Sequence, residues 1–215
     1  MKISIILAHP NPGSFNHVIA GTAADSLRRN GHEVFLHDLC EEKFPPLFTA
    51  AELGKNPNLP PFVARHCAEI AAADGIIIVH PNWWGMPPAI LKGWIDRVLL
   101  PEVAYRFVAS DKGEGVPQGL LTARSAIVFN TANTPDDQER ECFGDPLETL
   151  WKRCVFGMCG VKKVQRRTFS VVITSTPEQR AEWLEEVQAI VNVHFPAGNK
   201  PDSKLSKNKR MIPQP

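Results

Sequence analysis

A fully apolar segment, residues 75–79, runs into a loop of proline, tryptophan and glycine at residues 80–88 and then into a helical pattern at residues 89–98. The apolar segment is short and rich in isoleucine and valine, which is typical of a strand buried on both faces of a parallel sheet. A parallel strand needs a crossover connection, and the helical pattern provides one. This order predicts an α/β fold, in which ligands bind at loops that leave the carboxyl ends of the strands.

The loop of residues 80–88 has an unusual composition for a surface loop, because two adjacent tryptophans and a glycine stand between prolines. Proline restricts the backbone, and glycine lets a ligand approach the backbone closely. Such a loop suits a flat aromatic ring that is held by stacking and by backbone amides. Trp83 and Trp84 are also consistent with side chains that only cover a hydrophobic core, so the loop by itself leaves both interpretations open.

The alternation of strand and helix patterns extends along the chain. Strands are predicted within residues 2–8, 33–39, 75–79, 125–130 and 161–172, and helices at residues 16–30, 61–73, 89–98, 145–158 and 176–194. Residues 40–60 and 100–121 show no clear period and are expected to be irregular connections. Five strands joined by helices predict an α/β doubly wound, five-stranded parallel sheet in the flavodoxin-like order 2-1-3-4-5.

Two further loops leave predicted strands at the edge where the tryptophan loop lies. Residues 9–16 lead into a helix, and the free N–H groups at its start, together with Ser14 and Asn16, suit a phosphate or pyrophosphate. One of these two side chains is also expected to cap the helix. Residues 131–137 form a polar loop after the fourth strand. Because strands 1, 3 and 4 are neighbours in the predicted order, a phosphate site and a ring site would meet there, as a flavin nucleotide requires.

Composition narrows the possible partners. The net charge is +1 and the basic residues form no stripe before the C-terminal part, so no nucleic-acid partner is expected. No apolar run reaches transmembrane length, so no membrane insertion is expected. Five cysteines without a CxxC pair or a zinc-like spacing predict free thiols in a reducing cytoplasm, and no metal site. We expect one domain over residues 1–195 and a Pro- and Lys-rich tail over residues 196–215.

Several short motifs follow one another in a recognisable order. They are Ala8-His9-Pro10, Ser14-Phe15-Asn16, the run from Pro81 to Trp94, and Ala104-Tyr105. In these motifs the chain resembles the flavin-dependent NAD(P)H quinone reductases of flavodoxin-like fold. That family includes the mammalian DT-diaphorase type and the bacterial potassium-efflux ancillary oxidoreductases. The stretch from Pro81 to Arg97 is the specific part of this resemblance, and the other motifs support it.

The resemblance implies a ping-pong enzyme that moves two electrons from NAD(P)H through flavin N5 to a quinone or a similar flat acceptor. It implies a homodimer with each site at the subunit interface. Dimeric mammalian members of the family use FAD and the efflux-associated members use FMN, so FAD is expected and FMN is the alternative. The residues implied to bind the cofactor are His9, Ser14, Phe15, Asn16, Val18, Pro81, Asn82, Trp83, Trp84, Gly85, Asn130, Thr131, Ala132 and Asn133.

One departure from the family leaves the proton donor unassigned. The mammalian enzymes carry a tyrosine and a histidine after the fourth strand that stabilise charge on the reduced flavin, and the matching positions here hold Asp137 and Phe143. Two other functions stay open: a flavodoxin-type electron carrier, although such carriers tend to be acidic, and a flavin-binding regulatory subunit of a transporter. Turnover with NAD(P)H distinguishes an enzyme from both.

Overall fold

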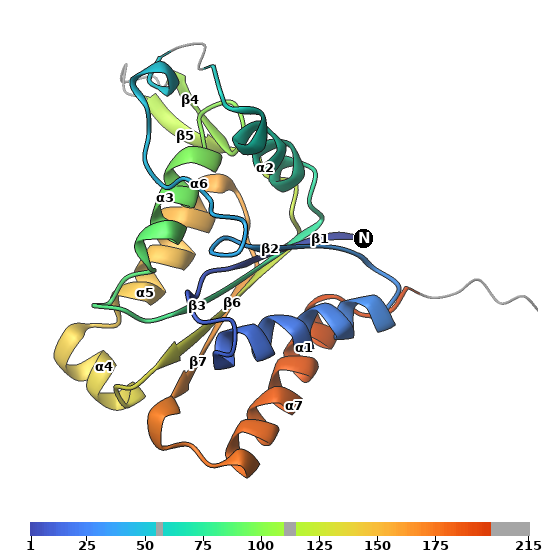
Figure 1. Ribbon diagram of the computed structural model, residues 1–215. Helices are drawn as coiled ribbons and strands as arrows, with labels where there is room; N and C mark the ends of the chain where they lie inside the picture. The colour runs from blue at the N-terminus through green and yellow to red at the C-terminus, as the bar shows by residue number, and fades with distance from the viewer. Residues whose placement is uncertain (55–57, 110–114, 199–215) are drawn as a thin grey trace, which may run out of the picture.

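Five parallel strands form the centre of the molecule in a computed structural model that describes residues 1–54, 58–109 and 115–198 (Figure 1). The strands are β1 (Lys2–Leu7), β2 (Glu33–Asp38), β3 (Gly75–Pro81), β6 (Ser125–Ala132) and β7 (Val164–Ser170). Their order in the sheet is β2-β1-β3-β6-β7. Counted along the chain this is 2-1-3-4-5, so the predicted flavodoxin-like α/β fold is confirmed. Most of the predicted tail, from residue 199 onward, lies outside the described residues.

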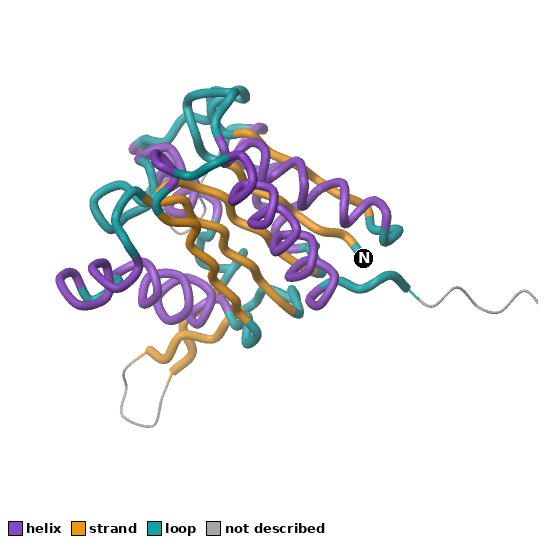
Figure 2. The backbone as a smooth tube through the Cα atoms, turned by 90° about the horizontal axis from the view of Figure 1, so that it is seen from below, coloured by secondary structure: helices purple, strands orange, loops and turns teal. Residues whose placement is uncertain are grey.

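Helices cover both faces of this sheet (Figures 1 and 2). One face carries α1 (Phe15–Arg29) and α7 (Pro177–His194), and the other carries α2 (Pro61–Ala71), α3 (Ala89–Val98), α5 (Pro146–Thr149) and α6 (Phe156–Cys159). The buried apolar side chains accordingly form two clusters, one between the sheet and each helical layer. Because both faces are covered, every residue of β3 and β6 is buried, which explains why residues 76–79 and 126–129 read as continuous apolar runs.

The carboxyl ends of β1, β3 and β6 lie at one edge of the sheet. In the parallel register Leu7 is opposite Val79, and Pro81 is opposite Thr131. The loops that follow these three strands therefore start beside one another. They lie at the topological switch point, where the chain changes the direction in which it adds strands to the sheet. No helix in the described part of the chain combines the length and apolar character that crossing a bilayer requires.

The expectation of an irregular connection over residues 100–121 was wrong in part. Strands β4 (Tyr105–Ala109) and β5 (Gly115–Gly119) pair there as an antiparallel hairpin separate from the main sheet. Every residue of both strands is at least partly exposed, so the hairpin has no buried face to create an alternating pattern. Backbone pairing between β4 and β5, and not hydrophobic periodicity, therefore defines the hairpin.

The segment after β6 also differs from the prediction. Helix α4 (Asp136–Phe143) occupies part of the expected polar loop, and it was missed because Glu139 is its only buried residue. The helix expected over residues 145–158 is present, but its middle turn, Leu150–Val155, is a π-helix between α5 and α6. Asp145 precedes α5 but makes no side-chain capping bond, and it pairs with Arg166 instead. Two short 3₁₀ turns complete the described structure, η1 (Ala50–Glu52) and η3 (Val172–Thr174).

Candidate functional site

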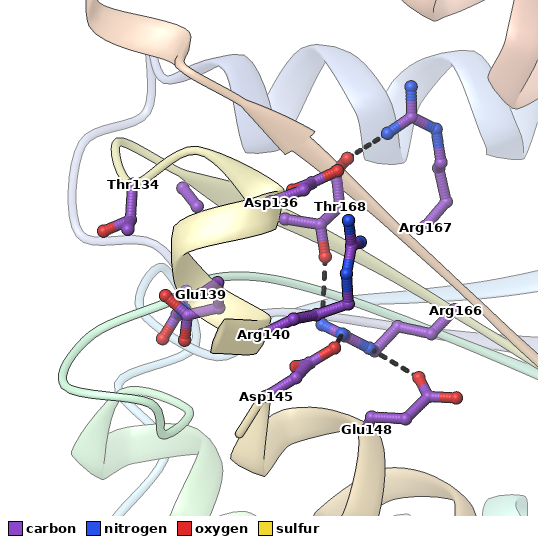
Figure 3. A pocket seen from close by; sticks show the side chains of 11 residues that line it. Thr134, Asp136, Glu139, Arg140, Asp145, Glu148, Arg166, Arg167 and Thr168 are labelled. Atoms are coloured by element: carbon purple, nitrogen blue, oxygen red, sulfur yellow. Dashed lines mark hydrogen bonds and ion pairs between the residues drawn. The ribbon is translucent and has the colours of Figure 1, made fainter. Parts of the chain in front are cut away.

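Three pockets open side by side at the carboxyl edge of the sheet. Asn82, Ala132 and Thr134 line all three, and the pocket volumes are about 360, 320 and 370 Å³. Each volume falls in the range of small-molecule sites, and the shared walls make one connected recess large enough for an elongated ligand. Figure 3 shows the first of them, which lies between α4 and the start of α5 and is rich in charged side chains.

Most of the sequence-predicted site residues come together around two of these pockets. One is lined by His9, Ser14, Phe15, Asn16, Pro81, Asn82, Trp83, Thr131, Ala132 and Asn133. Trp84 and Gly85 line the next, together with Glu139, Phe143 and Pro146. Two predicted residues lie elsewhere: Val18 is exposed on α1, and Asn130 is fully buried beneath the site. Asn130 therefore supports the wall of the recess and does not line it.

Two buried amide oxygens have no hydrogen-bond partner among the described residues, and both belong to pocket-lining side chains. Asn16 donates from Nδ2 to Thr131 Oγ1 at 2.9 Å, which leaves Asn16 Oδ1 without a partner. Asn82 donates from Nδ2 to Glu139 Oε1 at 2.9 Å, which leaves Asn82 Oδ1 in the same state. Buried acceptors are rarely left unsatisfied. These two atoms therefore fit a ligand that brings hydroxyl or N–H donors into the recess.

The tryptophan loop ends in a tight turn that projects one indole outward. Trp84 and Gly85 have φ angles of 57° and 68°, and the flanking Trp83 and Met86 exchange both backbone hydrogen bonds. Two consecutive residues with positive φ match a type I′ turn. A Cβ atom at Gly85 would lie 2.6 Å from Pro146 Cγ, so the turn packs closely against the start of α5. Trp84 is 101% exposed, which contradicts the alternative that it covers the core.

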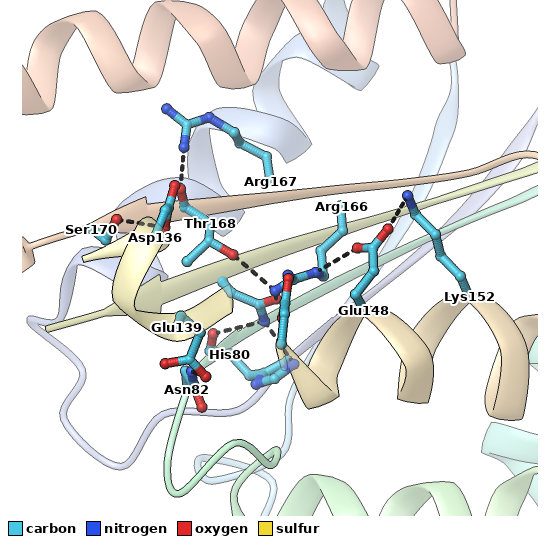
Figure 4. Close-up of polar contacts among 12 residues, drawn as sticks. His80, Asn82, Asp136, Glu139, Glu148, Lys152, Arg166, Arg167, Thr168 and Ser170 are labelled. Atoms are coloured by element: carbon cyan, nitrogen blue, oxygen red, sulfur yellow. Dashed lines mark hydrogen bonds and ion pairs between the residues drawn. The ribbon is translucent and has the colours of Figure 1, made fainter. Parts of the chain in front are cut away.

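A buried hydrogen-bond network lies under the site and fixes the end of β3 (Figure 4). His80 Nε2 accepts hydrogen bonds from Trp151 Nε1 at 3.0 Å and Asn130 Nδ2 at 2.8 Å. The proton of the neutral ring is therefore on Nδ1, which donates to the carbonyl of Pro81 at 2.8 Å. Complete burial lowers the pKa of His80 to about 4, so the ring stays neutral near pH 7.

Arg166 extends this network into the charged pocket. Its guanidinium donates to Asn130 Oδ1 at 3.2 Å and to Glu148 Oε2 at 3.0 Å, and it also pairs with Asp145 (Figures 3 and 4). Its side chain is only 9% exposed. Sequence reasoning missed Arg166 because it lies within a strand, and only the parallel pairing of β6 and β7 brings it beside Asn130. No local motif marks such a residue.

The two residues at the positions of the tyrosine and histidine of mammalian family members differ in where they lie relative to the pockets. Phe143 lines the pocket of Trp84, whereas Asp137 lines none of the three pockets. Glu139 is the carboxylate that lines both the charged pocket and the pocket of Trp84; it is 9% exposed and accepts a hydrogen bond from Asn82. Glu139 was missed because the helix that carries it was not predicted.

A second cluster of ionisable side chains lies on β2, on the loop after it and on α2. Ligand atoms of His37, Glu42 and His66 lie within 4.8 Å of one another, a spacing compatible with a metal ion. The indole N–H of Trp94 can only donate, and it donates to His66 Nδ1 at 3.1 Å, so Nε2 of the neutral ring carries the proton. That nitrogen faces Glu42 Oε2 at 3.3 Å. Neither atom makes a hydrogen bond among the described residues, but a metal needs the Nε2 lone pair, so the tautomer that Trp94 fixes disfavours a metal site.

Comparison with known proteins places this architecture in a family. The model of a flavodoxin-like fold family matches residues 1–191. An uncharacterized NAD(P)H oxidoreductase from Haemophilus influenzae is 34% identical over 192 residues, covering 86% of this chain and 91% of that protein. NAD(P)H dehydrogenase [quinone] 1 from Rattus norvegicus is 32% identical over 207 residues, covering 84% and 73%. A putative quinone reductase from Klebsiella pneumoniae superposes with a TM-score of 0.77 at 25% identity, covering 90% and 84%.

Proposed function

The chain belongs to the flavodoxin-like family of NAD(P)H quinone reductases and is an oxidoreductase, and from this premise we propose that it passes two electrons from NAD(P)H through a bound flavin to a quinone-like acceptor. The observation that carries this proposal is the connected recess at the carboxyl edge of the sheet. It joins a phosphate-type loop, two unpartnered amide oxygens and an exposed indole shelf. A nucleotide with a flat ring needs all three.

Each part of the recess has a role in this proposal. Ser14 and the first N–H groups of α1 would bind the phosphate end of the flavin. The open Oδ1 atoms of Asn16 and Asn82 would accept hydrogen bonds from flavin hydroxyl and N–H groups. When bound, a flavin supplies the ring that takes up and releases hydride, so the protein has only to position the reactants. FAD is the first expectation, and FMN the alternative.

The pocket beside Trp84 would receive NAD(P)H and the acceptor in turn, because this one pocket has room for only one flat ligand at a time. This sharing is the physical basis for a ping-pong order. Trp83 and Trp84 would exclude water from one side, and Asn82 and Glu139 form a polar wall on the other. No side chain is assigned as a proton donor.

We further propose that the active form is a homodimer of the domain over residues 1–195, with its site at the subunit interface. Three large apolar side chains of the tryptophan loop support this, because Trp83, Trp84 and Met86 are 45%, 101% and 41% exposed at the mouth of the recess. We place the enzyme in the cytoplasm, since all five cysteines are unpaired. The tail from residue 196 has no assigned role.

The visible spectrum of the purified protein tests the proposal directly. We expect flavin absorbance that bleaches when NADH or NADPH is added anaerobically and that returns when a quinone follows. Flavin that stays oxidised would favour an electron carrier or a regulatory subunit. A colourless protein that binds neither added FAD nor added FMN would contradict the proposal. Flavin released by denaturation would distinguish FAD from FMN.

Replacing Trp84 by alanine removes the exposed indole and tests whether this side chain forms part of the flavin site. We expect flavin retention or the rate of flavin reduction to fall about tenfold, because one aromatic contact contributes about 0.5–1.5 kcal/mol beyond its buried area. Stopped-flow reduction and flavin content per protomer measure the two effects. Phe107, which is 59% exposed on the separate hairpin, provides the matched control as Phe107→Ala. Unchanged flavin content and unchanged kinetics in Trp84→Ala would argue against this placing of the site.

A further inference from the structure

A chain of three hydrogen-bonded side chains runs along the phosphate end of the recess, and the proposed function uses only one of them, Ser14. Ser14 Oγ lies 2.8 Å from His17 Nδ1, and His17 Nε2 lies 2.7 Å from Asp38 Oδ2. The side chains of His17 and Asp38 are 18% and 14% exposed. Ser14 lines the recess, so the chain connects the wall of the ligand site to the end of β2.

The Ser14 hydroxyl does not cap α1, although its position at the start of that helix would allow it to do so. Ser14 is the N-cap residue of α1, yet its side chain makes no capping hydrogen bond, because Oγ is turned to His17. The first N–H groups of a helix have no intrahelical partner. The Ser14 hydroxyl therefore does not satisfy these groups and leaves them available to an anion.

The protonation state of His17 decides whether the hydroxyl can donate to such an anion. With Nε2–H donated to Asp38, the neutral ring presents a bare Nδ1, which must accept the Ser14 O–H. The hydroxyl then directs only lone pairs toward the recess. A protonated ring instead donates Nδ1–H to Ser14 Oγ, and the Ser14 proton becomes free to point at a bound phosphate. One proton on His17 thus converts Ser14 from an acceptor into a donor.

The surroundings of His17 contain both favourable and unfavourable groups for the protonated ring. Asp38 favours it, and backbone N–H groups of Cys40 and Glu41 hold that carboxylate in place at 3.0 and 3.2 Å. The positive end of α1 opposes it. His9 packs edge-on at 6.3 Å between ring centres, and burial lowers the pKa of His9, so it adds no charge near pH 7. The nearby Cys40 thiol also stays neutral, since burial and Asp38 raise its pKa.

We propose that His17 is a positioning residue for the phosphate of the cofactor, which acts through Ser14 and is held by Asp38. The proposal rests on the proposed function for the identity of the ligand, a phosphorylated flavin. Binding of the phosphate then takes up a proton at His17. Affinity for FAD should fall as the pH rises, by at most about tenfold per pH unit, because one proton is linked to one binding event. Riboflavin, which has no phosphate, should bind without this dependence.

The test is a set of dissociation constants for flavin-free protein between pH 6 and pH 9, measured by quenching of flavin fluorescence. Wild-type protein should bind FAD progressively more weakly as the pH rises. His17→Phe removes the group that accepts the Ser14 O–H at high pH, so it should bind FAD with an affinity that does not change with pH. Asp38→Asn keeps an oxygen for the Cys40 and Glu41 N–H groups but removes the charge, so the weakening should begin at lower pH.

His194→Gln is the matched control, since it changes a half-buried histidine that hydrogen bonds to Ser125 and Gln165 and lies outside the recess. It should keep the wild-type pH dependence. An FAD affinity that is constant from pH 6 to pH 9, or a slope that survives in His17→Phe, would overturn the proposal. If no flavin binds at any pH, the proposed function fails. Calorimetry with sulfate, whose charge is constant over this range, then decides alone: binding that weakens with pH only when His17 is present supports the proposal, and anything else overturns it.

Discussion

An Arg97→Ala variant is expected to lose about 3–5 kcal/mol of unfolding free energy, because it would leave a carboxylate buried without its partner. The side chains of Arg97 and Glu52 are 2% and 0% exposed. Arg97 Nε donates to Glu52 Oε1 at 2.8 Å, and the guanidinium also reaches the carbonyl of Pro45. One arginine on α3 therefore anchors two points of the long connection that follows β2. Denaturant unfolding measures the loss, and a change below about 1 kcal/mol would contradict this account.

The same helix offers a matched control. Lys92 and Asp96 also form an ion pair on α3, at 2.7 Å, but both are exposed, and Lys92→Ala should cost no more than about 1 kcal/mol. A double variant, Arg97→Met with Glu52→Leu, removes both charges together and should recover most of the lost stability. Failure of that recovery would show that the Pro45 contact or the hydrogen bonds from Thr49 to Glu52, and not the ion pair, dominate.

The Glu52 carboxyl also predicts how stability depends on acid. Burial alone would raise the pKa of Glu52, but hydrogen bonds from Thr49 and the interaction with Arg97 outweigh burial and hold the pKa below its ordinary value. A carboxyl with a depressed pKa in the fold stabilises it above the pKa of the unfolded chain. That contribution is lost as the pH falls through the folded pKa, so it should disappear from the acid limb of the stability profile in the double variant.

A His80→Ala variant is expected to lose about 3–5 kcal/mol, and to lose flavin as well. It creates a cavity in a fully buried position and leaves the N–H donors of Trp151 and Asn130 without their acceptor. It also releases the carbonyl of Pro81 at the start of the tryptophan loop. Unfolding curves and flavin content should therefore fall together. His80→Gln keeps a donor and an acceptor in one side chain and should be milder in both.

His80 also gives the stability a defined pH window. The pKa of the ring is about 4 in the fold and about 6.5 in an unfolded chain, so the unfolded state binds the extra proton between these values. Stability is fully present above the unfolded pKa and is lost as the pH falls toward the folded pKa. The 2.5-unit difference corresponds to about 3 kcal/mol at most. His80→Gln should lose this component, and a profile unchanged between pH 6.5 and pH 4 would contradict the assignment.

Much of the scaffold could be predicted from local patterns. Apolar runs identified the buried strands β3 and β6, and the glycine and proline positions marked the loops after them. The strand order followed because parallel strands with helical crossovers have few arrangements, and that order brought residues 9–16, 80–88 and 131–133 to one edge. Whether a residue lies in a loop at a strand end depends only on the neighbouring sequence. For this reason Ser14, Asn16 and Asn82 were predicted to lie at that edge.

Other parts depended on contacts that no local pattern records. The hairpin of β4 and β5 has no buried face, and α4 has a single buried residue, so neither creates a hydrophobic period. The exposure of Trp84 results from a turn whose packing partner, Pro146, is far away in the chain.

By itself, the sequence determined the α/β class, the order of the strands and the edge at which the predicted site residues gather, because these follow from short-range hydrophobic periods and turn residues. The tertiary structure alone decided the chemistry of that edge. Asn130 with Arg166, Asn82 with Glu139, and His17 with Asp38 are pairs of polar groups separated along the chain. Hydrogen bonds and charges act over a few ångströms in space, so their partners exist only once the sheet and its helices have been assembled.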